Sequence, residues 1–227
     1  MSRLIVVDGA DGAGKGTQVA LLCSRCDARG LKATVFDFPR YGQRTGKLIG
    51  DVLAGRHGDF LATSPYLASI PYMLDRAAAR DEMRTALADA DIVICNRYIS
   101  SNLAYGAAKI ADADERQRYI EFVEAVEHEE IRMPVPTLVL YLSVPVEVSF
   151  RLVEQKAART YIAEGAKDQH EADMSYQARV AACYRELASA RKDAWQVVEC
   201  APEGALLPPE AIHEKVWELV RLQCDFS

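Results

Sequence analysis

The sequence lacks any apolar run close to the roughly 18 residues that a membrane-spanning helix needs, so we expect no membrane span. It lacks the long apolar core of a signal peptide, because only Leu4 to Val7 form an apolar run before Asp8. It also lacks an excess of positive charge, since 27 Lys and Arg stand against 33 Asp and Glu and give a net charge of −6. A nucleic-acid coat would carry a basic field, so we expect neither a nucleic-acid nor a membrane partner.

The six cysteines lack the spacing of a disulfide framework. Cys23 and Cys26 form a C-x-x-C pair, but the pair falls inside a predicted helix. We therefore interpret both as small buried helix residues rather than as a redox or zinc site. Cysteines used in this way suit a reducing compartment, so we expect the protein to be cytoplasmic.

The most informative stretch of the chain is a glycine-rich turn between an apolar run, 4–7, and a helix-compatible segment that ends near Gly30. Its candidate ATP-binding residues are Gly9, Asp11, Gly12, Ala13, Gly14, Lys15, Gly16 and Thr17. Glycines let backbone N–H groups approach a polyphosphate, the helix N-terminus adds partial positive charge, and Lys15 adds a full charge. We therefore interpret the stretch as a phosphate-binding P-loop rather than as a plain turn.

Short apolar runs alternate with amphipathic segments along the rest of the chain. We predict strands at 4–7, 32–37, 91–95, 137–143 and 195–199, and helices after the P-loop, from Pro65, around 119–126, from Pro145, from Met174 and from Pro209. This alternation predicts an α/β protein in which helices flank a central five-stranded parallel sheet, in one domain over 1–227.

The helix expected from Pro65 has two notable features. Leu67, Ile70 and Leu74 fall on one face at helical spacing. Pro71 lies inside the same pattern and should kink the helix or delay its start.

Two arginines are expected close to the P-loop. Ligands of open α/β sheets bind beyond the carboxyl ends of the strands. Arg40 follows the second predicted strand and Arg97 follows the third, so both should lie near Lys15. Two arginines and a lysine at one sheet edge suit two phosphoryl groups better than one. We favour this interpretation over that of solvated surface charges.

These features belong to a longer set of motifs that is highly specific in its order. In chain order the motifs are Gly9-Ala10-Asp11-Gly12-Ala13-Gly14-Lys15, Phe38-Pro39-Arg40-Tyr41-Gly42, Leu74-Asp75-Arg76, Asn96-Arg97-Tyr98, Ser101-Asn102-Leu103-Ala104-Tyr105, and Asp168 to Glu171 ahead of Tyr184-Arg185-Glu186-Leu187-Ala188. The set resembles the thymidylate kinase family along nearly the whole chain. The resemblance implies a three-layer αβα P-loop kinase fold, ATP as donor, Mg²⁺ as cofactor, and transfer of a phosphoryl group to dTMP.

The resemblance also implies roles for single residues. The implied dTMP-binding set is Asp11, Phe38, Pro39, Arg40, Tyr72, Arg76, Arg97, Ser101, Asn102 and Tyr105. In that set the two arginines at strand ends would hold the 5′-phosphate, while Phe38 and Tyr72 would flank the pyrimidine. Arg76 and Asn102 would bind the edge of the base. Asp11 would meet the 3′-hydroxyl, and Tyr105 would occupy the space that a ribose 2′-hydroxyl needs.

Metal binding and the lid depart from the usual motifs. Gly16 stands where a hydroxyl usually ligates Mg²⁺, and Asn96 stands where the family usually has Asp. We expect nucleotide oxygens and water to hold the metal, together with Asp8 or Asp11. The resemblance places a lid at about 157–167. The P-loop carries no arginine, and the resemblance implies that such a kinase supplies this charge from its lid. Arg159, ahead of Lys156 and Lys167, is the lid candidate that joins Lys15 and Arg97 as a catalytic residue.

The residues leave alternatives for both acceptor and activity. Arg76 and Asn102 favour a pyrimidine but do not sense a 5-substituent, so dUMP or a modified pyrimidine deoxynucleotide is an alternative acceptor. Gly16 and Asn96 leave open a nucleotide-binding module with weak turnover. The resemblance, and not the periodicity, implies a homodimer.

Overall fold

The computed structural model of the protein describes residues 3–159 and 174–225, and for residues 154–159 it describes the backbone only. The strands are β1 (Leu4–Asp8), β2 (Ala33–Asp37), β3 (Ile92–Asn96), β4 (Leu138–Ser143) and β5 (Trp195–Glu199). The helices are α1 (Lys15–Ala28), α2 (Arg44–Leu53), α3 (Pro65–Asp89), α4 (Ile99–Ala107), α5 (Ala113–Glu124), the π-helix η1 (Ala125–Glu130), α6 (Val146–Arg159), α8 (Met174–Ala190), the 3₁₀-helix η2 (Pro202–Gly204) and α9 (Pro209–Cys224).

The strands form one parallel sheet in the order β2-β3-β1-β4-β5. Successive residues of a strand point to opposite faces, so β1 serves two cores: Leu4 and Val6 pack on one side, Ile5 and Val7 on the other. Both faces of the sheet are covered at β1, which explains why its residues do not alternate between apolar and polar. The predicted five-stranded parallel sheet is confirmed.

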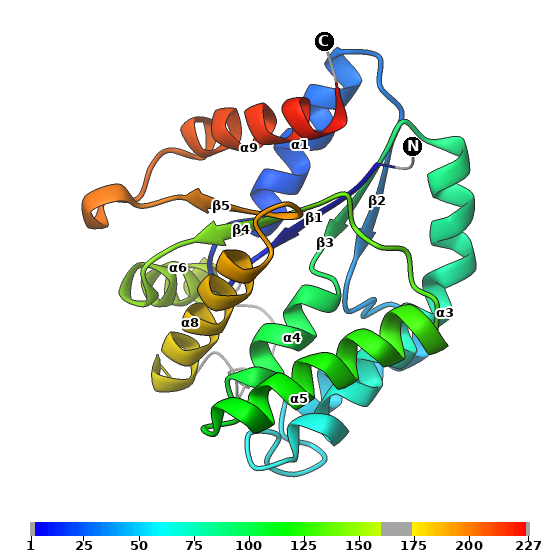
Figure 1. The fold of residues 1–227 in the computed structure, drawn as a ribbon. Coiled ribbons are helices and arrows are strands. Elements are labelled where there is room, and N and C mark those ends of the chain that lie inside the picture. Colours follow the sequence, from blue (N-terminus) through cyan, green and yellow to red (C-terminus); the bar gives the residue numbers. More distant parts are fainter. Residues whose placement is uncertain (1–2, 160–173, 226–227) are drawn as a thin grey trace.

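Helices cover both faces of the sheet, as Figure 1 shows. On one face α1 and α9 pack side by side and contribute Leu22 and Val216 to the core. On the other face α3, α4, α5 and α8 contribute residues such as Leu103 and Val180. The three-layer αβα arrangement expected from the sequence is therefore present, and the carboxyl ends of β1, β2 and β3 lie at a common edge.

Helix α3 exposes the apolar face that its sequence pattern defines. It runs from Pro65 to Asp89 and continues through Pro71 without a delayed start. The apolar stripe is the exposed side: Leu67, Ile70 and Leu74 are 63%, 41% and 53% exposed. The buried side carries polar residues, including Asp75 and Arg76. Hydrophobic spacing alone therefore does not identify the buried face of α3, because that face includes the charged residues Asp75 and Arg76.

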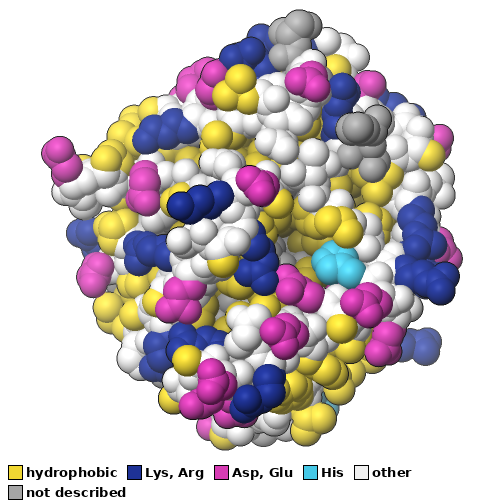
Figure 2. Space-filling view, in the orientation of Figure 1, with side chains coloured by type: hydrophobic (Ala, Val, Ile, Leu, Met, Phe, Trp, Pro, Cys, Tyr) yellow, Lys and Arg dark blue, Asp and Glu magenta, His cyan; other side chains and the backbone are white. Residues whose placement is uncertain are grey.

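The surface gives two further observations. Within residues 3–159 and 174–225, no helix combines the length and apolar character that crossing a bilayer requires. On the face shown in Figure 2, acidic and basic side chains are interspersed rather than gathered into one basic field.

Candidate functional site

The P-loop joins the end of β1 to the start of α1. Gly12 has φ 80°, and a Cβ there would lie 2.3 Å from the backbone oxygen of Ser149, so this turn requires glycine. Helix α1 begins at Lys15, so its first N–H groups face the loop. The Nζ of Lys15 donates to the carbonyls of Gly9 (3.0 Å) and Ala10 (2.7 Å). The loop therefore holds a nearly buried ammonium group at an anion-binding helix end.

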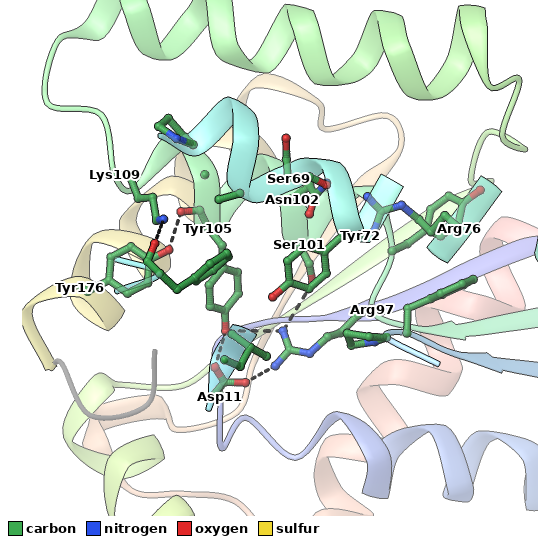
Figure 3. Close-up of a pocket in the computed structure, with 18 of the residues that line it drawn as sticks. Asp11, Ser69, Tyr72, Arg76, Arg97, Ser101, Asn102, Tyr105, Lys109 and Tyr176 are labelled. Atoms are coloured by element: carbon green, nitrogen blue, oxygen red, sulfur yellow. Dashed lines mark hydrogen bonds and ion pairs between the residues drawn. The ribbon is translucent and has the colours of Figure 1, made fainter. Parts of the chain in front are cut away.

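Arg97, Asp11 and Tyr105 form a charged group beside this loop (Figure 3). Arg97 has φ 62° and pairs through Nη2 with Asp11 Oδ1, while the Tyr105 hydroxyl donates to Asp11 Oδ2 at 2.8 Å. Burial lowers the pKa of Arg97, but Asp11, together with Tyr105, Tyr184 and Asp8, outweighs that effect, so the pKa stands well above its usual value. Burial and Asp11 together raise the pKa of Tyr105. Arg97 is therefore a permanent cation and Tyr105 a neutral donor.

Asp8 is fully buried beneath this group and its oxygens are occupied. Its carboxylate accepts hydrogen bonds from the backbone N–H of Gly9 (2.8 Å), Ser100 Oγ (2.5 Å), Ser101 Oγ (2.9 Å) and Tyr184 OH (2.8 Å). Burial, followed by the Asp8 charge, raises the pKa of Tyr184, which keeps that donor protonated. The arrangement suits Asp8 to organise α4 and α8 around the P-loop rather than to ligate a metal directly.

A cavity of about 150 Å³ opens from Arg97 and runs beneath α3 and α4. Of the predicted dTMP-binding residues, it is lined by Asp11, Phe38, Pro39, Tyr72, Arg76, Arg97, Ser101, Asn102 and Tyr105. These side chains come from loops and helices that are far apart in sequence; Asp11 and Tyr105, for example, are 94 positions apart. The structure thus brings the motif residues to one place.

Arg40 is the predicted dTMP-binding residue that does not line the cavity. Its backbone N–H donates to Asp75 Oδ2 (2.8 Å) and its Nη2 donates to the Asp75 backbone oxygen (2.8 Å). Thr45 Oγ1 occupies the other carboxylate oxygen of Asp75 at 2.7 Å. In this arrangement Arg40 connects the loop after β2 to α3. A contact of Arg40 with the phosphate stays a prediction.

The inner end of the cavity has polar partners that the sequence did not predict. Arg76 forms a buried ion pair with Glu127 of η1. Asn102 Nδ2 donates to the Ser69 backbone oxygen at 3.3 Å, and the Tyr119 hydroxyl donates to the Asn102 backbone oxygen at 2.9 Å. No signal identified Glu127, because a π-turn breaks the helical period on which the pattern depends.

Other lining residues were also missed. Tyr41 belongs to a quoted motif but was given no role, and Tyr176 and Lys109 come from segments that carried no prediction of a site. Burial lowers the pKa of Lys109 to about 8, although nearby Asp59 opposes the shift. Lys109 Nζ donates to the backbone oxygen of Phe60 at 2.5 Å, so it ties the loop before α3 to the end of α4.

The donor set near the P-loop fits a magnesium ion held mainly through nucleotide and water. Asn96 Oδ1, at the end of β3, is buried and accepts no hydrogen bond within the described part of the chain. The described residues contain no group of three or more His, Cys, Asp or Glu placed to hold a metal by themselves. Asp11 and the Asn96 oxygen are the donors that fit a hydrated divalent ion.

One catalytic candidate is not part of the described site. The Arg159 side chain and residues 160–167 of the expected lid lie outside the described residues.

Comparisons with known proteins agree with these motifs. The model of the family described as thymidylate kinase matches residues 7–215. A thymidylate kinase of Mycobacterium tuberculosis is 34% identical over 82% of this chain and 86% of that protein. A thymidylate kinase of Thermomicrobium roseum is 33% identical over 97% of this chain and 95% of that protein. The solved thymidylate kinase of Candida albicans has a similar fold, with a TM-score of 0.72, 21% identity, and coverage of 97% of this chain and 92% of that one.

Proposed function

Because this chain belongs to the thymidylate kinase family, we propose that it transfers the terminal phosphoryl group of ATP to dTMP, giving ADP and dTDP. One observation carries the proposal: a single cavity runs from Arg97, beside the P-loop, to the base-edge donors Arg76 and Asn102. Its ends suit the phosphate and the pyrimidine of one nucleotide. Nothing in the comparisons favours dUMP, a modified pyrimidine or a weakly active module.

Positioning and charge neutralisation supply the catalysis. The attacking oxygen belongs to an ionised phosphate, so no general base is needed. Within the described residues, the contacts of Arg97 Nη1 are long: Gly9 O lies at 3.4 Å, Ser101 Oγ and Tyr105 OH at 3.5 Å, and Asp8 Oδ1 at 3.9 Å. Phosphate oxygens replace such contacts with short charge-assisted bonds. Lys15 holds the donor phosphates on the other side, so the two substrates meet in line between the two cations.

Magnesium supplies neutralisation of charge on the donor phosphates when it is bound. Asp11 and Asn96 Oδ1 are the residues that would accept hydrogen bonds from its water ligands. Asp11 also faces the sugar 3′-hydroxyl in this proposal. The lid at about 157–167, with Arg159, is proposed on the family resemblance alone, as are a single kinase domain and a cytoplasmic location.

An acceptor panel tests the function. Release of ADP from Mg·ATP is measured with dTMP, dUMP, dCMP and the ribonucleotide counterpart of dTMP. We expect dTMP to give the highest kcat/KM, the ribonucleotide to be poor because Tyr105 closes the sugar pocket, and omission of Mg²⁺ to stop turnover. ADP release that does not respond to dTMP would contradict the proposal.

The exposed stripe of α3 supports a homodimer. Leu67, Ile70 and Leu74 form a row of apolar side chains along one helix, and exposed apolar patches of this kind mark interaction sites. We expect the chain to be a dimer by light scattering and Ile70→Asp to be a monomer, because a charge on the stripe would be buried unpaired. A monomeric unaltered chain, or an Ile70→Asp dimer, would exclude this interface.

A further inference from the structure

The most deeply buried ion pair of the described residues lies at the inner end of the cavity. Arg76 is 2% exposed and Glu127 is 0% exposed. Arg76 Nε lies 2.9 Å from Glu127 Oε1 and 3.2 Å from Oε2, and Nη2 bonds to Oε1 as well. Burial lowers the pKa of Arg76, but the charge and hydrogen bonds of Glu127, with Tyr98 and Asp75, more than compensate and the pKa is raised. The Arg76 guanidinium is therefore a buried cation.

Stability alone is a poor reason for such a pair. Two buried charges lose so much hydration that apolar residues of similar size stabilise a core equally well or better. Glu127 also occupies a π-helix, a turn type that is rare and often found at functional sites. The placement of Glu127 therefore calls for a role beyond packing.

Several contacts fix the position of Glu127. The Met133 N–H donates to the Glu127 backbone oxygen at 2.8 Å. Arg80 Nη1 and Arg84 Nη2, both on α3, donate to the backbone oxygens of Ile131 (3.1 Å) and Arg132 (2.8 Å) just after η1. The end of η1 is thus anchored to the helix that carries Arg76, which sets the distance between the two charges.

The pair leaves one side of the guanidinium available. Glu127 occupies Nε and Nη2, whereas Nη1 makes no hydrogen bond within the described residues, and Arg76 lines the cavity beside Tyr72 and Asn102 (Figure 3). We propose that Glu127 is a positioning residue for base recognition: it locks Arg76 in the one orientation that presents Nη1 to an acceptor on the pyrimidine edge. This inference rests on the proposed function.

Among the described residues, no carboxylate other than Glu127 forms an ion pair with Arg76. Asp75 is the adjacent residue on α3, but Arg40 and Thr45 occupy its oxygens. Without Glu127 the Arg76 guanidinium would be free to rotate, and the nucleotide would have to restrict it on binding. The cost should appear in dTMP binding rather than in the chemical step.

The test is Glu127→Gln, measured by steady-state kinetics and calorimetric binding of dTMP. We expect KM and Kd for dTMP to rise about tenfold to a hundredfold, the loss of one charge-assisted hydrogen bond, while kcat and KM for ATP change less than about threefold. The matched control is Glu124→Gln, one turn earlier, which removes the Arg191–Glu124 pair and should leave dTMP kinetics unchanged.

Two further variants separate positioning from folding. In an Arg76→Met background, adding Glu127→Gln should change KM for dTMP by less than about twofold, because Glu127 then has nothing to position. If Glu127→Gln fails to fold, Glu127→Asp replaces it in the test. This variant keeps the carboxylate on a shorter side chain, so KM for dTMP should rise while kcat stays unchanged. An unchanged KM in a folded Glu127 variant, or a full additive loss in the double variant, overturns the proposal. Lack of dTMP-dependent ADP release by the unaltered protein would instead fail the proposed function.

Discussion

Lys15→Ala is expected to lower kcat by about a thousandfold while the melting temperature stays within a few degrees. The Lys15 Nζ is held by the carbonyls of Gly9 and Ala10, at the first residue of α1, where a donor phosphate meets both the ammonium and the helix N-terminus. The ammonium stabilises charge that develops during transfer, and loss of one such preorganised donor costs roughly a hundredfold to a thousandfold. Steady-state ADP release and a thermal melt measure the two effects.

Lys192→Ala is the matched control, because it removes an exposed lysine from the turn between α8 and β5. It should leave both kcat and melting temperature unchanged. A Lys15→Ala variant with normal kcat would show that the P-loop cation takes no part in transfer. A variant that no longer melts cooperatively would show that the ammonium mainly holds the loop carbonyls.

The sequence predicted the parts of this protein in which local pattern and tertiary environment agree. The β1 run is apolar on both faces because both faces are covered, and the P-loop needs its glycines because Gly12 has no room for a Cβ. Strand ends then placed Arg97 next to Lys15 by topology alone. Such features can be predicted without knowledge of the neighbouring elements.

Other features depended on neighbours that no local pattern reveals. Helix α3 exposes Leu67 and buries Arg76, because its inner face lines the cavity. There Arg76 pairs with Glu127, which lies 51 positions further along the chain. Helix α2 was not predicted and no bounds were predicted for α4, since both are short, with ten and nine residues. The contact of Arg40 with Asp75 likewise could not be read from the chain order.

Gly106→Ala is expected to destabilise the protein by about 3 kcal/mol, the upper part of the usual range for overpacking. A Cβ on Gly106 would lie 1.9 Å from the hydroxyl oxygen and 2.2 Å from Cζ of Tyr119, whose side chain is fully buried. Tyr119 cannot yield without losing its hydrogen bond to the Asn102 backbone oxygen, so KM for dTMP should rise as well. Chemical denaturation measures the first effect and steady-state kinetics the second.

Gly50→Ala is the matched control, since a Cβ there would lie 3.6 Å from Tyr41 Cδ1, an ordinary contact, within α2. It should be neutral or stabilise the protein by up to about 1 kcal/mol through helix propensity. Adding Tyr119→Leu to Gly106→Ala removes the ring end that collides, so the double variant should be less destabilised than the sum of the two single changes. Strict additivity, or a Gly106→Ala protein as stable as the parent, would mean that Tyr119 does not form a fixed wall behind Asn102.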